Sequence, residues 1–273
     1  MSQPASLYAD LSAYYDLFCA EVDYEEQCLF TRRAFDCFAS SGGQRYLDLA
    51  CGTGAHIHHM QSYGFQATGL DNSADMLQQA ALRCPHAALI LSDMSAFQAP
   101  EPYDLISCFL YSIHYSHPVS SLKQTLQRVY DALRPGGVFV FNTVDIRGIT
   151  GRHFVTTRVR TDQTLLSFSS GWTYAGQGEA MLLQLSISEQ RTEPVSISVS
   201  EPVTKPVSET AQQAPHIKQW RDTHTMTAMT IEELRNWLQG TGFEVTLLEH
   251  DYSRLQPWSG STFNVIVVAG KPR

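Results

Sequence analysis

Positive charge is scarce in this chain. Its 273 residues include 19 Lys and Arg against 27 Asp and Glu, which gives a net charge of −8 at pH 7, and no run of Lys or Arg occurs. Proteins that bind nucleic acid usually present a basic face to the phosphates. We therefore expect neither DNA nor RNA to be a partner.

Paired cysteines and long apolar runs are missing as well. The six cysteines all lie between Cys19 and Cys108, and the absence of a C-x-x-C pair disfavours a zinc site and a disulfide framework. The start, MSQPASLYAD, has no basic region followed by an apolar core, and no apolar run reaches the roughly 18 residues of a membrane helix. We expect a cytoplasmic protein with reduced cysteines, no metal and no membrane contact.

Short apolar runs alternate with longer helical patterns from Arg45 to Asn142. This alternation predicts a parallel sheet covered by helices on both faces. The predicted segments are the strand RYLDL, the helix AHIHHMQSY, the strand QATGL, the helix SADMLQQAALRC, the strands AALILS and YDLISCFL, the helix VSSLKQTLQRVYDAL, and the strand VFVFN. The Gly pair of LRPGG is expected to end the third helix.

Both ends of the chain extend the pattern. Residues 6–40 are predicted to be helical. Near the other end, Thr230 and Glu233 form a capping box that begins the helix TIEELRNWLQG. The segments EVTLLEH and TFNVIVVAG then close the chain as two strands.

Residues 150–229 have a different sequence pattern, in which strand-like segments follow one another without helices between them. FVTTRVR, TLLSFSSGWTY and AMLLQLSIS are strand-like, with a turn at AGQG. Their apolar residues share strand parities that would line one face of an antiparallel sheet: Leu166, Phe168, Trp172 and Tyr174, then Met181, Leu183, Leu185 and Ile187. The prolines of residues 193–215 exclude a central strand, so that stretch is expected to be an exposed edge or a mobile excursion. We predict a β arm inserted between the fifth strand and the last helix, dividing the chain into 1–149 with 230–273, and 150–229.

A glycine-containing turn follows the first predicted strand, in YLDLACGTGAHIH. Such a turn brings backbone N–H groups and a helix N-terminus close to a ligand. Asp71, 17 residues after Gly54, ends the second predicted strand, where a carboxylate reaches a ribose. Nicotinamide dinucleotides and S-adenosylmethionine both use this geometry. The dinucleotide pattern G-x-G-x-x-G is broken here by Ile57, and Asp48 or the loop carbonyls suit an ammonium group instead.

At this point the chain resembles the class I S-adenosylmethionine-dependent methyltransferases of the small-molecule branch. The resemblance rests on LDLACGTG, GLDNSADML, SDM, YDLIS and LRPGGVFVF, in this order. It implies a Rossmann-like, doubly wound α/β sheet of seven strands with the last one antiparallel. Ala50 replaces the first glycine of the family's loop.

The resemblance also implies site roles by position. Asp48 and the loop Ala50–Gly54, with Gly52, would hold the methionyl part of the cofactor. Asp71 would hold the ribose, Asp93 the adenine amino group, and Asn72 and Met94 the faces of the ring. Tyr14 or Tyr15, in AYYDLF, would cover the cofactor as part of an N-terminal lid.

The acceptor should lie beyond the carboxyl ends of the strands. The run CFLYSIHYSH there lacks the Pro-Pro-Tyr or Pro-Cys signatures of amino- and cytosine-type enzymes, and no acidic cluster suggests a magnesium site. His114, Tyr111 and Tyr115 are the candidate catalytic residues. His114 would act either as a base near neutral pH or only as an orienting group.

The arm offers a second set of candidates. In QWRDTHTMT, one strand face carries Trp220, Asp222, His224 and Met226, and the other, expected to be solvated, carries Arg221, Thr223, Thr225 and Thr227. Trp172, Trp220 and His224 are the predicted substrate-binding residues, with packing inside the arm as the alternative.

The sequence therefore favours transfer of a methyl group from S-adenosylmethionine to an oxygen or nitrogen of a small molecule. Two alternatives remain open: a non-catalytic S-adenosylmethionine-binding module whose arm pairs with a partner, and a nicotinamide-dependent oxidoreductase. The expected partner is a small-molecule acceptor, and a homodimer is left open. The sequence does not identify the acceptor.

Overall fold

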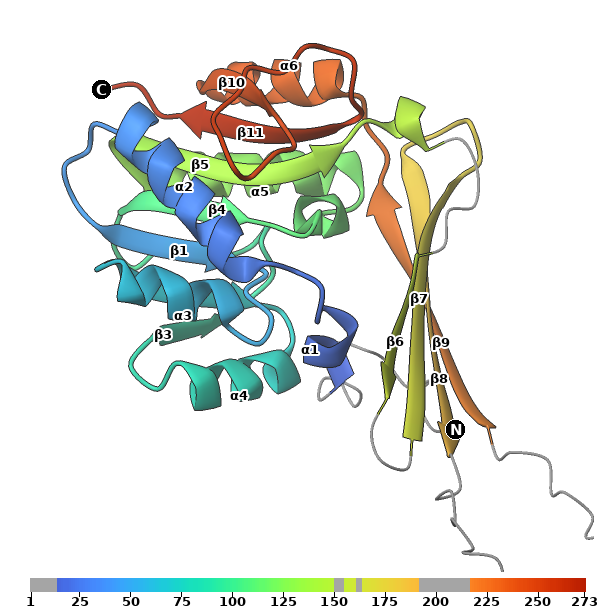
Figure 1. The fold of residues 1–273 in the computed structure, drawn as a ribbon. Helices are drawn as coiled ribbons and strands as arrows, with labels where there is room; N and C mark the ends of the chain where they lie inside the picture. The colour runs from blue at the N-terminus through green and yellow to red at the C-terminus, as the bar shows by residue number, and fades with distance from the viewer. Residues whose placement is uncertain (1–13, 150–154, 161–163, 192–216) are drawn as a thin grey trace, which may run out of the picture.

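The computed structural model describes residues 14–149, 155–160, 164–191 and 217–273, and these form an α/β body beside a separate β arm (Figure 1). The predicted segment 193–215 lies outside the described residues. The body sheet has the strand order β10-β11-β5-β4-β1-β2-β3. Its strands are β1 (Arg45–Leu49), β2 (Gln66–Asp71), β3 (Ala88–Leu91), β4 (Tyr103–Cys108), β5 (Leu133–Val144), β10 (Glu244–Glu249) and β11 (Asn264–Gly270).

The body sheet is the predicted one. Strands β1 to β5 pair in parallel, and β11 runs antiparallel to both β5 and β10. The four residues of β4 from Leu105 to Cys108 are fully buried, as expected for a parallel strand covered on both faces. The seven-stranded α/β class, with its last strand antiparallel, is confirmed.

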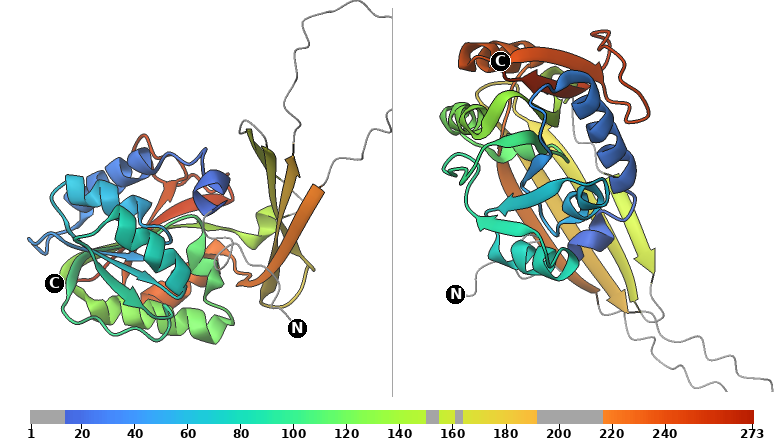
Figure 2. Two further views of the ribbon diagram at one scale, coloured as in Figure 1. Left: turned by 90° about the horizontal axis from the view of Figure 1, so that it is seen from below. Right: turned by 90° about the vertical axis from the view of Figure 1, so that its left-hand side faces the viewer.

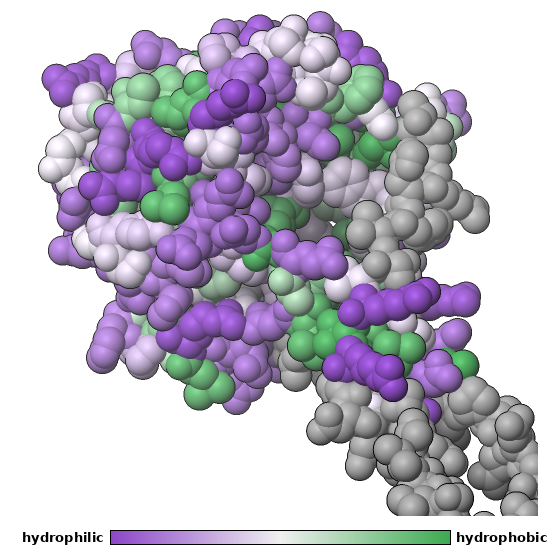
Figure 3. Space-filling model, viewed as in Figure 1, coloured by the Kyte–Doolittle hydropathy of each residue, from purple (hydrophilic) through white to green (hydrophobic). Residues whose placement is uncertain are grey.

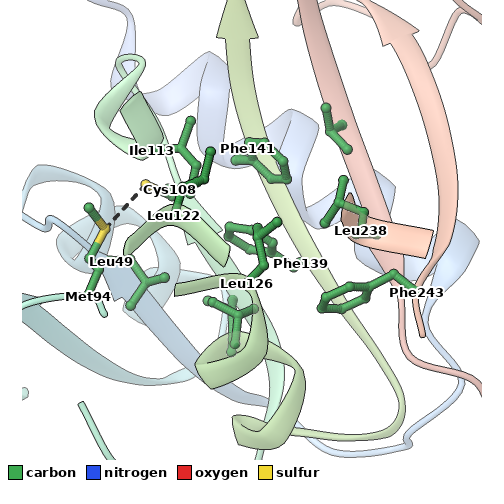
Figure 4. Packing of buried hydrophobic residues seen from close by; sticks show 14 of the residues in the cluster. Leu49, Met94, Cys108, Ile113, Leu122, Leu126, Phe139, Phe141, Leu238 and Phe243 are labelled. Carbon is green, nitrogen blue, oxygen red and sulfur yellow. Dashed lines mark hydrogen bonds between the residues drawn. The ribbon is translucent and has the colours of Figure 1, made fainter. Parts of the chain in front are cut away.

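Helices cover both faces of this sheet, so it is doubly wound. Phe30 of α2 and Ile57 of α3 pack on one face, and Leu126 of α5 and Leu238 of α6 pack on the other. Figure 4 shows the second layer, where these last two side chains converge on Phe139 and Phe141. The helices are α1 (Tyr15–Phe18), α2 (Tyr24–Phe38), α3 (Ala55–Ser62), α4 (Ala74–Arg83), α5 (Val119–Ala132) and α6 (Ile231–Thr241).

The arm is a four-stranded antiparallel sheet in the order β6-β7-β8-β9. Its strands are β6 (Val155–Arg160), β7 (Thr164–Tyr174), β8 (Ala180–Arg191) and β9 (Ile217–Thr227). The predicted parity holds, because Phe168 pairs with Ile187 and Trp172 with Leu183, and all of them belong to one apolar cluster. The left view of Figure 2 shows the arm standing beside the body, and in Figure 1 it stands on the side toward which β1 and β5 point.

The arm leaves and rejoins the body at adjacent points. Ile146, just after β5, donates its N–H to the carbonyl of Met229 at 3.0 Å. Asp145 accepts from the N–H of Ile231 at 3.0 Å, where α6 begins with the predicted capping box at Thr230. The two connections are therefore held together by hydrogen bonds at the carboxyl end of β5.

Four local expectations need correction. Helix α5 ends at Ala132 and β5 begins at Leu133, so the glycine pair lies inside β5 rather than ending the helix. Strand β4 ends at Cys108, because Leu110 and Tyr111 adopt left-handed backbone conformations with φ of 54° and 60°. Of the helical start, the described part before α2 holds only the four residues of α1. Thr227 was expected to be solvated but is buried, because its hydroxyl donates to the carbonyl of Ser116 at 2.7 Å.

Candidate active site

A pocket opens at the carboxyl ends of the parallel strands, next to the arm. It encloses about 770 Å³ of empty space including its open mouth. The lining residues come from α1, the turn after β1, the ends of β2 and β3, and the segment after β4: Tyr15, Ala50, Gly52, Leu70, Asp71, Asn72, Ser92, Asp93, Met94, Leu110, Ser112 and Tyr115. A ligand there would lie at the carboxyl ends of β1, β2, β3 and β4, as ligands of parallel α/β sheets do.

The turn after β1 has the shape that its sequence predicts. Ala50, Gly52 and Gly54 all have positive φ, at 54°, 54° and 83°. A Cβ on Gly52 would lie 3.6 Å from the Tyr15 ring, in the pocket. A Cβ on Gly54 would instead meet Ala80 at 3.2 Å. Gly52 therefore keeps the pocket open, whereas Gly54 permits close packing of α3 on α4.

Asp71 ties the end of β2 to this turn. One carboxylate oxygen accepts from the N–H of Gly52 at 2.9 Å, and the other accepts from the N–H of Ser73 at 2.9 Å. Burial raises the pKa of Asp71, and these N–H donors oppose that shift. Ser73, and not Asp71, caps helix α4. Asp71 thus both shapes the turn and lines the pocket.

The end of β3 forms the next part of the wall. Asp93 is exposed and holds the following turn by accepting from the N–H and hydroxyl of Ser95 at 2.8 and 2.6 Å. Met94 lines the pocket and is 8% exposed. Its sulfur lies 3.9 Å from the thiol of Cys108, which connects the pocket to the core drawn in Figure 4. Asn72 is an exposed residue at the rim.

Asp48 is placed differently from the other predicted cofactor residues, because it lies fully buried behind the turn. One of its oxygens accepts from the hydroxyl of Ser107 at 2.7 Å. The other has no hydrogen-bond partner among the described residues and lies 3.7 Å from Nδ1 of His56. Burial raises the pKa of Asp48 to about 7 and lowers that of His56 to about 3. Asp48 is thus a carboxyl group that can change charge near neutral pH.

His56 also marks a smaller pocket that continues from the first. Both pockets share Tyr15, Ala50, Leu110 and Ser112, and the smaller one adds Tyr24 and His56. The Nε2–H of His56 donates to Gln27 at 2.8 Å. The sequence reasoning did not single out Gln27, Tyr24 or His56, because they lie on helices whose patterns show only core spacing.

A short lid covers the mouth of the pocket. Helix α1 lies between body and arm in Figure 1 and in the left view of Figure 2, and places Tyr15 over Gly52. Asp16 beside it accepts from the hydroxyl of Thr53 at 2.7 Å and from Arg83 at 2.5 Å, and Arg83 also donates to the Thr53 carbonyl at 2.7 Å. We call Asp16, Thr53 and Arg83 the latch, because they join the lid to the turn and to α4.

His114 is fully buried and both ring nitrogens are engaged. Nδ1 donates to the carbonyl of Thr227 at 2.7 Å, and Nε2 accepts from the hydroxyl of Thr143 at 2.9 Å. Burial lowers the pKa of His114 to about 4. The imidazole is therefore neutral at pH 7 and joins the arm to the body. This geometry gives no support to a base at His114 and favours the orienting role.

Tyr111 and Tyr115 frame the 3₁₀ turn Ser112–Tyr115, and each meets the arm. The Tyr111 ring packs edge-on against Trp172 with centroids 4.8 Å apart, and the Tyr115 ring packs edge-on against His224 at 5.5 Å. Trp220 lies 6.3 Å from Tyr14 of the lid. The predicted substrate-binding residues thus face the same side as the predicted catalytic tyrosines. In Figure 3, apolar surface gathers where the arm meets the body.

A polar group beneath Tyr111 escaped the sequence reasoning. Asn142, buried on β5, accepts from the N–H of Tyr111 at 3.0 Å and so supports its left-handed backbone. The hydroxyl of Tyr111 lies 3.5 Å from Nε2 of His250, which also contacts Tyr252 at 3.2 Å. Burial raises the pKa of Tyr111 to about 12 and lowers that of His250. A polar Asn at the end of the apolar run VFVFN was the signal available in the sequence.

Over the described ranges, no cluster of three or more His, Cys, Asp or Glu is arranged to hold a metal ion. None of the helices in those ranges is long and apolar enough to cross a membrane.

The pocket fits S-adenosylmethionine, which pairs an adenosine with a charged amino-acid tail. The carboxylates of Asp71 and Asp93, together with the space between Gly52 and the Tyr15 ring, suit the nucleoside. The smaller pocket, with the unpartnered oxygen of Asp48 behind it, suits the tail that carries an ammonium group.

Comparison with known proteins also finds methyltransferases. The family model described as "Methyltransferase domain" matches residues 47–137. The dTDP-4-amino-2,3,4,6-tetradeoxy-D-glucose N,N-dimethyltransferase of Saccharopolyspora spinosa is 29% identical over 152 residues, covering 51% of this chain and 60% of that protein. The dTDP-3-amino-3,4,6-trideoxy-alpha-D-glucopyranose N,N-dimethyltransferase of Streptomyces venezuelae is 34% identical over 94 residues, or 34% and 40% of the two chains. This chain thus spans about half the length of these curated relatives.

A solved structure shares the whole fold. The sugar N-methyltransferase KedS8 of Streptoalloteichus superimposes with a TM-score of 0.75 at 19% identity and covers 100% of this chain and 99% of its own. Residues 47–137 therefore match the family model of a methyltransferase domain, and the chain shares its fold with solved S-adenosylmethionine-dependent methyltransferases.

Proposed function

We propose that this protein transfers a methyl group from S-adenosylmethionine to a nitrogen of a small polar molecule. One observation carries the proposal: Tyr115 lines the pocket and at the same time contacts His224 of the arm. The pocket therefore lies next to an aromatic surface of the arm, where a small acceptor can bind. Amino sugars are the first class to test, because the relatives named above are sugar N-methyltransferases.

The cofactor is held by the residues that line the pocket in this proposal. Asp71 accepts from the ribose hydroxyls, Asp93 from the adenine amino group, and Met94 and Asn72 flank the ring. The turn from Ala50 to Gly54 and the charge of Asp48 receive the methionyl end. S-adenosylmethionine supplies an electrophilic methyl group on a sulfonium. Residues 1–149 and 230–273 then bind the cofactor, and residues 150–229 shape the acceptor site.

The chain's own residues position the acceptor and exclude water. Tyr15 closes the mouth, while Tyr111, Tyr115 and Trp172 offer apolar edges against which a sugar ring packs. Methyl transfer needs an in-line approach, and holding two reactants in that geometry supplies a large part of the acceleration. Binding and alignment are therefore the main work of this site.

The test is a two-stage assay. S-adenosylmethionine should raise the melting temperature and NAD should not. The protein should then convert S-adenosylmethionine to S-adenosylhomocysteine in the presence of a dTDP-3-amino or dTDP-4-amino sugar, and mass spectrometry should find 14 mass units added per methyl group. Binding of S-adenosylmethionine without turnover across such amines and their hydroxyl analogues would favour a non-catalytic module instead.

Two finer predictions accompany the proposal. We propose a cytoplasmic location, which a fluorescent fusion can check. We also propose that the protein is not retained on DNA or RNA at low salt. Light scattering measures whether it is a monomer or a homodimer.

A further inference from the structure

His250, the first residue after β10, has one ring nitrogen on which three polar groups of the body converge. Nε2 lies 3.2 Å from the hydroxyl of Tyr252 and 3.5 Å from the hydroxyl of Tyr111. Nδ2 of Asn142 lies 3.4 Å from the same nitrogen. The amide oxygen of Asn142 accepts from the N–H of Tyr111, so its NH₂ group is the part that faces the imidazole. All three groups can therefore donate to Nε2.

This convergence determines where the imidazole carries its hydrogen. The NH₂ group of Asn142 can only donate, so Nε2 offers its lone pair and the hydrogen of the neutral ring lies on Nδ1. Burial lowers the pKa of His250, which keeps the ring neutral at pH 7. His250 is therefore a hydrogen-bond acceptor built into the wall of the body.

Tyr111 is held by His250 at its ring as well as at its hydroxyl. The two rings are stacked, with centroids 5.9 Å apart and planes inclined by 18°. The backbone of Tyr111 has φ 60°, a left-handed conformation that a bulky residue adopts only when its surroundings impose it. Contacts from Asn142 to the backbone and from His250 to the side chain supply that restraint.

Tyr252 connects this arrangement to the core beneath α2. Arg33 donates to the carbonyl of Tyr252 at 2.5 Å. The rings of Phe30 and Phe109 pack edge-on against the Tyr252 ring, with centroids 5.6 and 6.0 Å away. All three rings belong to the apolar cluster on that face of the sheet. His250 thus lies between Tyr111 and a side chain that the core holds in place.

Tyr111 also reaches the arm and the edge of the cofactor pocket. Its ring meets Trp172 edge-on with centroids 4.8 Å apart. Its neighbours in the chain, Leu110 and Ser112, both line the pocket, whereas Tyr111 itself is not among the lining residues. A turn of the Tyr111 ring would therefore alter the surface between pocket and arm and leave the cofactor's own contacts in place.

Resting on the proposed function above, we propose that His250 is a positioning residue for the methyl acceptor and that it acts through Tyr111. In the proposed site the acceptor packs against the Tyr111 ring, and His250 sets the place of that ring from the body side. Loss of the imidazole frees the ring to turn. The acceptor then binds more weakly, while S-adenosylmethionine, which contacts other residues, binds as before.

The first test needs no turnover. In the protein bound to S-adenosylhomocysteine, ¹⁵N-histidine NMR should show His250 as a neutral ring with its hydrogen on Nδ1, the signal being assigned by its loss in His250→Gln. Tyr111→Phe and Tyr252→Phe should each shift the Nε2 resonance, because each removes a donor to that nitrogen. A hydrogen on Nε2, or a resonance that Tyr111→Phe leaves in place, overturns the proposal.

The second test uses turnover of a dTDP-3-amino or dTDP-4-amino sugar. His250→Leu should raise the acceptor KM about tenfold, the size expected for one lost hydrogen bond. The kcat and the S-adenosylmethionine Kd should stay close to the wild-type values, as they do when only acceptor binding is lost. His250→Gln, whose side-chain oxygen can accept from Tyr111, should recover most of the loss. His86→Leu, at an exposed histidine before β3, is the matched control and should leave the KM unchanged.

A double-mutant cycle shows whether His250 acts through Tyr111. Tyr111→Ala removes the ring and should raise the acceptor KM at least as much as His250→Leu does. The double variant should be no worse than Tyr111→Ala alone, because the ring that His250 positions is already gone. Effects of the two substitutions that multiply would show independent roles and overturn the proposal.

The outcomes separate the two proposals. If the wild type turns over the amine and His250→Leu keeps the wild-type acceptor KM, the positioning role fails while the proposed function stands. If the wild type turns over no amine, the proposed function fails and takes this inference with it. Equal losses of acceptor and cofactor affinity in His250→Leu, unrelieved in His250→Gln, would show a purely structural role and overturn the inference.

Discussion

Tyr15 lies over Gly52: a methyl group placed on Gly52 would sit 3.6 Å from Cε1 of the tyrosine ring. Lid and turn therefore face each other across the space that the cofactor needs. The backbone of Gly52, at φ 54°, is also in a region that residues with a side chain adopt at a cost.

Gly52→Ala should therefore weaken S-adenosylmethionine at least tenfold, because the new methyl group takes cofactor space. The backbone strain alone should cost about 1 kcal/mol of stability. Gly178→Ala is the matched control, since Gly178 has φ 80° with nothing within 4 Å of a new Cβ. Calorimetry should find an equal loss of stability in the two variants and a loss of cofactor affinity in Gly52→Ala alone.

Asp71→Ala should weaken S-adenosylmethionine by about 1–3 kcal/mol, the cost of leaving buried donors without a partner. The change removes both the predicted ribose contact and the acceptor for Gly52 N–H. Asp93→Ala, in the exposed turn, should cost less. Unchanged affinity in Asp71→Ala, measured by titration calorimetry, would contradict the ribose assignment.

The latch should control how fast the cofactor leaves. Asp16→Asn and Arg83→Met break the ion pair that ties the lid to α4, and each should speed S-adenosylmethionine dissociation by about 3–10-fold, which stopped-flow fluorescence can follow. Partly exposed ion pairs weaken in salt. Raising the ionic strength should therefore bring the dissociation rates of the wild type and the two variants closer together. Arg32→Met, which breaks the comparable pair with Asp36 on α2, should leave the rate unchanged.

Asp48 should make stability fall as pH rises from about 4 to about 7. Its pKa is raised by burial to about 7 from 3.8, so in this window the folded state keeps a proton that the unfolded state releases. Asp48→Asn removes this pH dependence, because the amide does not titrate. Ser107 and His56 can still contact the amide of the new Asn. The variant should be about 1–3 kcal/mol more stable than wild type above pH 7, with no difference near pH 4. Urea unfolding across this range measures the change, and a constant offset would argue against it.

The titration of His114 should change stability with pH in the opposite direction to that of Asp48. The pKa of His114 is lowered by burial to about 4 from 6.5, so the unfolded state binds the extra proton and stability is lost as pH falls from about 6.5 to 4. His114→Gln should lower the melting temperature at pH 7, since contacts to Thr227 and Thr143 are lost, and should flatten this acid dependence. The His114→Gln substitution should change the affinity for S-adenosylmethionine only slightly.

The fold of the body and the inner face of the arm could be predicted from the sequence, because both follow from local periodicity. Strands β1 to β5 with their helices carry strong alternating patterns, and parity alone placed Phe168 and Leu185 on one face. The turn after β1 and the placement of Asp71 followed from its glycines and the strand end.

Contacts between distant segments could not be inferred in the same way. Asp16 and Arg83 are 67 positions apart, and neither position is unusual in its own helix. His114 looked available because the sequence shows an imidazole beside two tyrosines, whereas its partners Thr143 and Thr227 come from β5 and β9. Pairing of this kind is set by how the arm folds back on the body.

The pocket draws its lining from Tyr15 to Tyr115, while the arm's strands begin only at Val155. Alternate positions of β9 belong to opposite surfaces, so changes at positions 220, 222 and 224 alter the side that faces the body, and changes at 221, 223 and 225 do not. Under the proposed function, the acceptor range of such a chain can therefore change through substitutions on one side of one strand, while the residues that line the methyl-donor pocket stay the same.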